Sequence, residues 1–538
     1  TAVASKAIIL DSNKDYTGLR NLTITGELDA ATLDISGNVD IDGVLETDNL
    51  TVGGAQGSDG QVLTSTGSGV GWEDAAAGIT NKTFGTSSIM IGDSSTGTID
   101  AANYNTGLGI DVFAALTTGD NNIAVGYQAL DANTTGHENT AVGRLALSAN
   151  TTAADNTALG NSALSVNTTG GSNTAVGSGA LDGNTTASNN TAVGASALVA
   201  NTTGALNVAL GANALDANTT GSQNIGIGSD ALTTATTGDD NIAIGRLAMR
   251  FTTTASDNVA IGTTAMQDNT TGDQNTAVGV SSLNANTTGR NIVAVGYNTL
   301  GANTTGASNV AVGMNALDAN TTADNNTAVG TDALTANTTG TANVAVGFGA
   351  LDANTTANDN IAVGGNALGA NTVGTANVGV GAGALSANTS ASNNTAVGFA
   401  AMTATTTGNN NTAVGKSTMV TNTTGNYNTA LGYFTLNANT TAANNTALGY
   451  NALAVNTTGA DNTAVGMLAL DANTTASNNT AVGSSALTAT TTGAYNTAVG
   501  MTALGANTTG SYNVAVGSNA LDANTTGAGN IAVGHSAL

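Results

Sequence analysis

The side chains best suited to acid–base or metal chemistry are two histidines and a set of recurring aspartates. His137 and His535 occupy variable positions in a repeated sequence unit, and they are predicted to be solvated. Seven aspartates share one position of that unit, where Ser, Thr, Gly, Asn and Val replace them in other copies: Asp131, Asp182, Asp216, Asp318, Asp352, Asp471 and Asp522. Catalysis needs polar groups gathered in a pocket with shifted pKa values. These residues form at most an acidic edge, so we expect no enzyme activity.

Metal and cofactor sites are not predicted either. Cys is absent, which removes thiolate ligands. The Gly-Gly-x-Gly-x-Asp nonapeptide of calcium-binding solenoids does not occur in the sequence. The Asn-Thr-Thr turns match the N-glycosylation acceptor pattern, but the match follows from the repeat, and we interpret the turns as structural.

Composition and charge exclude several classes of partner. The net charge is −26 with nine Lys and Arg in all, which disfavours nucleic acid and anionic membranes. No apolar run approaches the roughly 20 residues that span a bilayer. Only 3% of residues are aromatic, Pro is absent and Gly numbers 71, a composition that suits a thin, tightly stacked object.

The histidines and recurring aspartates lie within a 17-residue repeat, so the fold of this repeat determines where they stand. Asn122-Ile-Ala-Val-Gly126 recurs as Asn139-Thr-Ala-Val-Gly143, and stepping by 17 from Gly92 to Gly534 meets glycine at each of 27 copies. Disordered tracts have no reason to keep such a register, whereas an inserted residue would break the stacking of a solenoid. We therefore predict an all-β fold, a parallel β-roll or β-solenoid of 17-residue coils, about 125 Å long at about 4.8 Å per coil.

The consensus N-T-A-V-G-x-x-A-L-x-A-N-T-T-G-x-x assigns a role to each conserved position. In a representative copy these positions are Asn122, Ala124, Val125, Gly126, Leu130, Asn133 and Gly136. Gly126 is expected to supply a turn with positive φ, and Leu130 to fill the coil from its second side. The segment from Asn133 to Gly136 is a turn by composition, whose Asn and Thr should form hydrogen-bonded ladders.

Alternation of side chains along a strand separates two faces. We assign Val125 and the residue two positions before it to the interior of the coil. The residue between them is Ala or Gly in every copy except the first, where it is Met90. A small residue suits a close approach of chains, so we predict an interchain seam, formed by Ala124, Ala141, Ala158, Ala277 and Ala311 among others. The alternative is that alanine is merely tolerated on an exposed face.

This seam predicts a parallel assembly, most simply a homotrimer. In that case Ala277→Leu should disrupt assembly more than Thr276→Val.

The repeat resembles the head repeat of trimeric autotransporter adhesins (YadA-like heads), and its Asn-Thr-Thr-Gly version resembles repeats of bacteriophage tail fibres. The resemblance covers residues 88–538 and implies a left-handed β-roll in a trimeric fibre. Residues 1–55, with units such as Leu22-Thr-Ile-Thr-Gly26, look like an intertwined β shaft. Residues 56–87 form a small connector, in which Gly60-Gln-Val-Leu63 through Trp72 resembles a phage-fibre motif; Trp72 is expected to anchor a small interchain core.

The function expected from this resemblance is structural. The chain would be part of a virion tail fibre that mediates or spaces adhesion to a host receptor, joined to the baseplate or tail through its N-terminal side. An autotransporter would carry a signal peptide and a membrane barrel, so their absence favours the virion fibre; because the chain starts at Thr1, we expect a processed product. The alternatives are a bacterial cell-surface adhesin or extracellular filament and, less favoured, an ice-binding solenoid.

Overall fold

The computed structural model describes residues 101–538 and, before them, the backbone of 51–52, 55–56, 61–65, 70–74, 80–84 and 88–92, with side chains from Ser88 to Ile91. Chain contacts divide the protein into two units, Thr1–Ala77 and Gly78–Leu538. The first unit contains two antiparallel pairs, β1 (Thr51–Val52) with β2 (Ala55–Gln56), and β3 (Gln61–Ser65) with β4 (Val70–Asp74). Of the predicted shaft at 1–55, residues 1–50, 53 and 54 lie outside the described residues, as does the side chain of Trp72.

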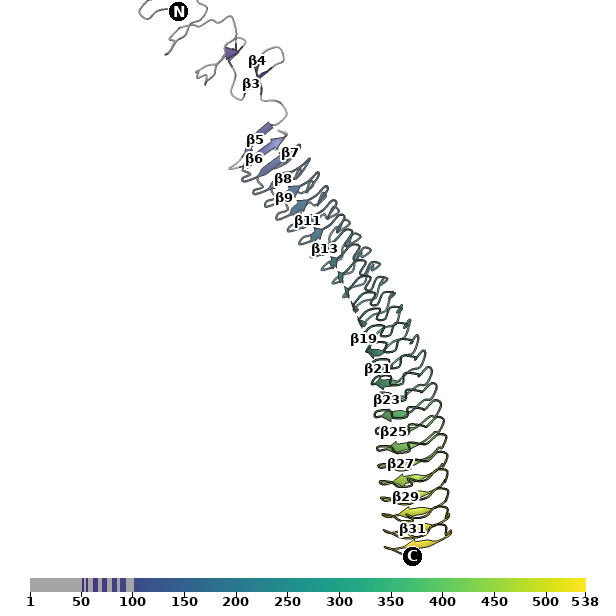
Figure 1. Cartoon of the computed structure of the whole chain (residues 1–538). Helices are drawn as coiled ribbons and strands as arrows, with labels where there is room; N and C mark the ends of the chain where they lie inside the picture. The colour runs from purple at the N-terminus through teal and green to yellow at the C-terminus, as the bar shows by residue number, and fades with distance from the viewer. Residues whose placement is uncertain are drawn as a thin grey trace, which may run out of the picture. The chain divides into compact units, whose positions relative to one another are not determined.

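The second unit is a ladder of parallel strands (Figure 1). It begins with β5 (Thr80–Phe84) antiparallel to β6 (Ser88–Gly92), and β6 is parallel to β7 (Thr106–Gly109). The later strands have three residues each: β8 (Ile123–Val125), β9 (Thr140–Val142), β10 (Thr157–Leu159), β11 (Thr174–Val176), β12 (Thr191–Val193), β13 (Val208–Leu210), β14 (Ile225–Ile227), β15 (Ile242–Ile244), β16 (Val259–Ile261), β17 (Thr276–Val278), β18 (Val293–Val295), β19 (Val310–Val312), β20 (Thr327–Val329), β21 (Val344–Val346), β22 (Ile361–Val363), β23 (Val378–Val380), β24 (Thr395–Val397), β25 (Thr412–Val414), β26 (Thr429–Leu431), β27 (Thr446–Leu448), β28 (Thr463–Val465), β29 (Thr480–Val482), β30 (Thr497–Val499), β31 (Val514–Val516) and β32 (Ile531–Val533).

Each strand pairs with the strand one coil further on, in a constant register. Thr140 lies opposite Thr157 and Ala141 opposite Ala158, so the offset is one 17-residue repeat. All regular elements among the described residues are strands. The predicted all-β parallel solenoid of 17-residue coils is therefore confirmed.

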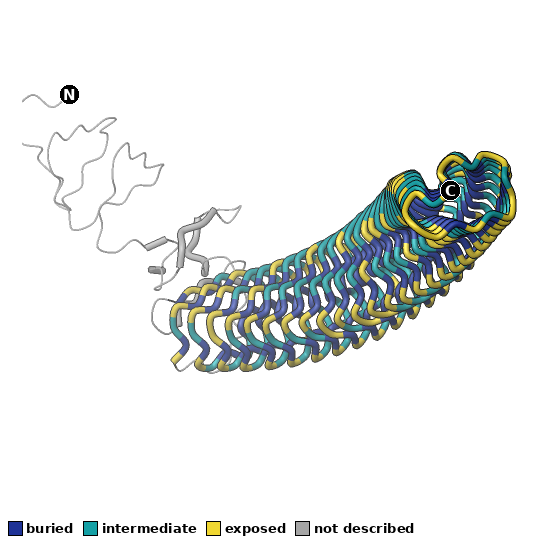
Figure 2. Tube along the Cα trace, turned by 90° about the horizontal axis from the view of Figure 1, so that it is seen from below, coloured by how far each residue is buried: buried dark blue, intermediate teal, exposed yellow. Residues whose placement is uncertain are grey.

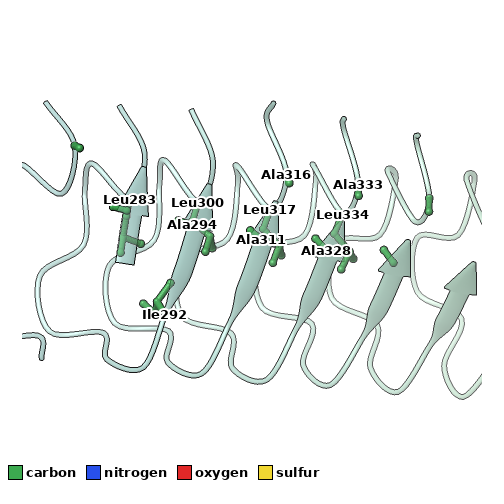
Figure 3. Close-up of a cluster of buried hydrophobic side chains, with 14 of the residues drawn as sticks. Leu283, Ile292, Ala294, Leu300, Ala311, Ala316, Leu317, Ala328, Ala333 and Leu334 are labelled. Carbon is green, nitrogen blue, oxygen red and sulfur yellow. The ribbon is translucent and has the colours of Figure 1, made fainter. Parts of the chain in front are cut away.

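The interior of each coil is narrow and is filled by three apolar side chains. We number the coil positions 1 to 17 from Asn122, so these are Ala124 at position 3, Ala129 at position 8 and Leu130 at position 9, all with no exposed surface. Figure 3 shows the leucines and alanines of successive coils in rows between the strands and the opposite side of the coil. An ideal Cβ built on Gly226, at position 3, would lie 3.2 Å from Cγ of Leu215, so the strand faces the leucine directly.

The glycine at position 5 is required by both conformation and space. Gly126 has φ of 133°, a region that L side chains rarely adopt. A Cβ there would lie 2.4 Å from the carbonyl oxygen of Gly143 in the next coil, which is backbone and has no room to yield. The predicted positive-φ turn at the strand end is confirmed, and the close approach of the next coil explains why no copy replaces this glycine.

A left-handed leucine recurs at position 9. Leu130 has φ of 53°, as do its equivalents within a few degrees, although this conformation costs a non-glycine residue about 1–2 kcal/mol. The backbone N–H of Leu130 donates to the carbonyl oxygen of Ala146 in the next coil, at 3.1 Å. The turn directs the leucine side chain into the interior and lets its backbone N–H bond to the next coil. Burial of the side chain and this hydrogen bond together offset the cost of the left-handed conformation.

Two columns of buried asparagines hold the coils together. At position 1, Oδ1 of Asn122 accepts from the backbone N–H of Asn139 at 3.0 Å and from its Nδ2 at 3.1 Å. At position 12, Nδ2 of Asn150 donates to Oδ1 of Asn133 at 3.1 Å. The carbonyl oxygen of Gly136 accepts from both columns, from Asn122 and Asn133, at 3.0 Å each. The position-12 bonds confirm the asparagine ladder predicted for the turn, whereas the position-1 column was not predicted from the sequence; together they close the turn around position 15.

The position-12 column is broken where another residue replaces asparagine. After Asn133, position 12 lacks asparagine in four coils: Ala235 and the adjacent Thr252 form one break, and Thr405 and Thr490 form two more. The amide oxygens of the asparagines one coil earlier, Asn218, Asn388 and Asn473, are buried and have no hydrogen-bond partner. Each break therefore leaves a buried acceptor without its donor, which costs about 1–3 kcal/mol.

Restoring one link should stabilise the solenoid locally. In Thr405→Asn, the new Nδ2 would donate to Oδ1 of Asn388, and the new Oδ1 would accept from Nδ2 of Asn422. We expect amide hydrogen exchange in these three coils to slow by the equivalent of about 1–3 kcal/mol. The exposed Thr407→Asn makes the same chemical change two residues away and should have no effect; equal protection in both variants would contradict the ladder's role.

Candidate functional surfaces

The strand has the opposite orientation to the one expected from sequence. The five alanines of the predicted seam, Ala124, Ala141, Ala158, Ala277 and Ala311, have no exposed surface within a single chain. Where glycine takes their place, at Gly226 and Gly379, the strand lies directly against the leucine of the preceding coil, Leu215 or Leu368, which is why the position stays small. The seam assignment is therefore wrong, and Ala277→Leu would overpack a coil interior rather than disturb an assembly.

The outer face of the strands carries positions 2 and 4, and we call it the strand face. Val125 lies on it and is half-buried, and Ile123, Leu159 and Leu431 are 43%, 47% and 45% exposed. Position 4 is Val, Ile or Leu in all 27 copies and position 2 is Thr, Val or Ile. Figure 2 shows these intermediate and exposed segments running along the stacked coils beside the buried ones. The strand face is therefore a continuous uncharged strip. The sequence did not predict it, because positions 2 and 4 were expected to point into the coil.

The aspartates at position 10 stand in one column but make no site. Burial raises the pKa of Asp131, Asp216, Asp318, Asp352 and Asp471 above the ordinary value, with the charge of Asp111 adding to the effect at Asp131. Backbone N–H groups of neighbouring residues partly oppose the shift at Asp216, Asp318 and Asp352. The column is an edge of partly desolvated carboxylates, and its contacts are single hydrogen bonds between coils, such as that from Nδ2 of Asn298 to Oδ1 of Asp318 at 2.8 Å.

The histidines and the remaining acids form no metal centre in the described residues. His137 and His535 are exposed, and His535 contacts only the hydroxyl of its neighbour Ser536 at 3.1 Å. Across the described part of the chain, no group of three or more His, Cys, Asp or Glu side chains lies close enough to share a cation. In the same residues no helix has the length and hydropathy to cross a membrane.

Comparison of the chain with family models, with curated proteins and with solved structures finds no match. The candidate surfaces therefore rest on the geometry and chemistry of this chain.

The position-10 column predicts a pH-dependent stability effect. A raised pKa means that folded Asp471 holds its proton more tightly than the unfolded chain does, so its contribution to stability falls as pH rises above about 3.8. Asp471→Asn, a residue found at this position in Asn284 and Asn437, should unfold at a higher temperature than the parent at pH 7. The difference should vanish near pH 3, where the carboxyl is protonated in both states.

The control is Asp522→Asn, at the same coil position but exposed. It should change the unfolding temperature at neither pH. A stabilisation of Asp471→Asn that persists at pH 3 would show that something other than desolvation of the carboxylate is responsible.

Proposed function

We propose that this chain is the shaft of a homotrimeric attachment fibre in which a left-handed solenoid from each chain lies parallel to the other two. The fibre spaces or mediates adhesion to a host receptor, and the attachment point lies at its N-terminal side. The observation that carries the proposal is the strand face, an uncharged strip of branched side chains that runs through every coil.

The strand face is larger and more uniform than the surface of a solitary chain requires. Twenty-seven coils at about 4.8 Å, and about 7 Å between alternate residues, give a strip of roughly 900 Å². Stable interfaces bury about 800 Å² on each partner, so the footprint of the strip has the size of a specific contact. A single-layer strand exposed to water normally carries charged residues, and the strand face carries none.

Repetition favours identical partners in parallel. Because each chain presents the same branched side chains once per coil, a second copy in the same direction and register meets a surface of equal pitch. Three chains around one axis each bury a single face, which is the arrangement implied by the resemblance to YadA-like heads and phage fibres.

The stacking also favours a spacer rather than a row of separate sites. Each coil is tied to the next by backbone bonds such as Thr140 N–H to the carbonyl of Asn156 at 2.8 Å, and by the asparagine columns. Solenoids of this kind transmit contacts only between neighbours and form extended columns. A virion tail fibre uses such a column, and a bacterial surface adhesin or extracellular filament would use it in the same way.

Ice binding is less favoured because the turn presents one threonine column. Thr135 is exposed, whereas Oγ1 of Thr134 is engaged with the carbonyl of Thr151 at 3.0 Å. A lattice-matching surface needs regular two-dimensional arrays of free hydroxyls. One exposed threonine per turn makes a single line.

Charge placed on the strand face should separate the chains. We expect Val278→Asp, Val295→Asp and Val312→Asp, combined in three adjacent coils, to convert a trimer into monomers at low micromolar concentration, because three chains would bring nine carboxylates together. Sedimentation velocity measures the mass, and circular dichroism shows whether the coils stay folded. The three valines are partly exposed within one chain, so the coil itself should tolerate the change.

The matched control places three aspartates in the same coils at position 14, as Thr288→Asp, Thr305→Asp and Thr322→Asp. These threonines are exposed, and the variant should remain trimeric. A parent chain that sediments as a monomer, or equal masses for both variants, would contradict the strand face as the seam.

The attachment role is tested on the particle. Antibody raised against the solenoid, with a gold label, should mark fibres that project from virions in electron micrographs, and should block adsorption to the host. Label on bacterial surfaces in the absence of virions would instead support the adhesin.

A further inference from the structure

Large exposed side chains gather at position 6 of five successive coils. Phe399, Lys416, Tyr433, Tyr450 and Met467 each stand two residues after the end of a strand, from β24 to β28 in the green part of the ladder in Figure 1. Phe399 is 58% exposed, Tyr450 51% and Met467 52%. The whole chain has only 16 aromatic residues, nine Tyr, six Phe and one Trp, so this column is a marked concentration of them.

The rings and the Lys416 ammonium form a continuous series of contacts along the coils. Tyr433 and Tyr450 are stacked, with centroids 5.8 Å apart and planes 14° from parallel, and Phe434 packs beside Tyr433 at 4.7 Å. The ammonium of Lys416 lies 5.9 Å from the ring centroid of Phe399 and 6.0 Å from that of Tyr433, within cation–π range. We call Phe399, Lys416, Tyr433, Phe434, Tyr450 and Met467 together the aromatic column. At about 4.8 Å per coil, its five coils span about 19 Å.

Negative charge is missing where the aromatic column lies. No Asp or Glu occurs between Asp359 and Asp461, a stretch of 101 residues, and Lys416 is its one charged residue. The next longest stretch without acids within residues 101–538 has 50 residues, from 472 to 521. It holds the other stacked pair, Tyr495 and Tyr512, whose centroids are 5.0 Å apart. In a chain of net charge −26, both aromatic stacks therefore lie in the two longest acid-free stretches.

We infer that the aromatic column binds an acidic polysaccharide, a chain of sugar rings that carry carboxylate groups. The apolar C–H faces of pyranose rings pack on aromatic rings, and a linear polymer matches a linear column. A neutral glycan would gain nothing from the removal of carboxylates over six coils, whereas an anionic glycan would be repelled by them. Lys416, exposed in the middle of the column, offers the ligand one cation.

This inference rests on the proposed attachment role, for which it names the class of receptor. The two are tested separately, because oligomeric mass reports on the strand face and glycan binding reports on the aromatic column. The aromatic column does not include the outer strand positions, such as Val414 and Leu431, which belong to the proposed contact between chains.

The experiment measures binding of the full chain to alginate oligosaccharides, a polymer of uronic acids, by titration calorimetry, with neutral dextran as the comparison. We expect alginate to bind and dextran not to bind, and the affinity to fall as salt is raised from 50 to 300 mM, because exposed charges are screened. Tyr433→Ala with Tyr450→Ala should weaken alginate binding at least about tenfold, which corresponds to about 1.4 kcal/mol.

A charge variant tests the acid-free surface directly. Ser417→Asp with Asn451→Asp places carboxylates beside the column at position 7, which already holds Asp230 and Asp332 in other coils with the same backbone conformation. The fold should therefore tolerate them, and alginate binding should be lost. The matched control is Phe348→Ala, which removes an exposed aromatic at position 6 beside Asp352, outside the acid-free stretch, and should leave binding unchanged.

Three results would overturn the inference. They are absence of alginate binding by the parent chain, equal binding of dextran, and unaltered alginate binding in the Ser417→Asp, Asn451→Asp variant. If the tyrosine variant instead loses trimer mass, the column belongs to the contact between chains, and the attachment shaft stands without this receptor.

Discussion

The solenoid depends on one constraint, that most polar groups of a coil find a partner in the adjacent coil, about one repeat of 17 residues away. The backbone ladder, the asparagine columns and the threonine hydroxyls all obey it, as in the bonds from Asn139 to Asn122 and from Thr134 to Thr151. A single inserted residue would displace every donor after it by one place. Because buried unsatisfied amides cost about 1–3 kcal/mol each, the repeat keeps its length through all 27 copies.

The same constraint limits the thickness of the coil. One leucine from the far side reaches the strand, as Leu215 does at Gly226, and this leaves room for alanine or glycine at position 3. The first coils show the same limit, because Met90 fills the strand position there and the next coil has Gly107, where an ideal Cβ would lie 3.1 Å from Cγ of Met90. An interior this narrow holds few large residues, so most of the aromatic side chains in residues 101–538 lie on the surface.

Because the interior is filled, any binding function of these coils depends on side chains at their surface. Two parts of it differ from the rest, the strand face without charge along the whole ladder and the aromatic column without acids over six coils. They make different demands, since an interchain seam needs uniformity from coil to coil, whereas a ligand site needs a local departure from the repeat. The position-10 aspartates are scattered among the coils and most are partly buried, and they meet neither demand.

The fold class, the coil length, the strand-end glycine and the position-12 asparagine column could all be read from the sequence, because each depends on spacing alone. Gly126 and Asn133 recur where a tight turn and a buried amide must recur. Alternation also separated Ala124 from Val125, but it could not tell which of them points inward, because both are apolar. That depended on Leu130, whose left-handed backbone directs it against the alanine and leaves the valine outside. The strain of that turn is repaid by hydrogen bonds to the next coil, a contact that no local sequence pattern contains.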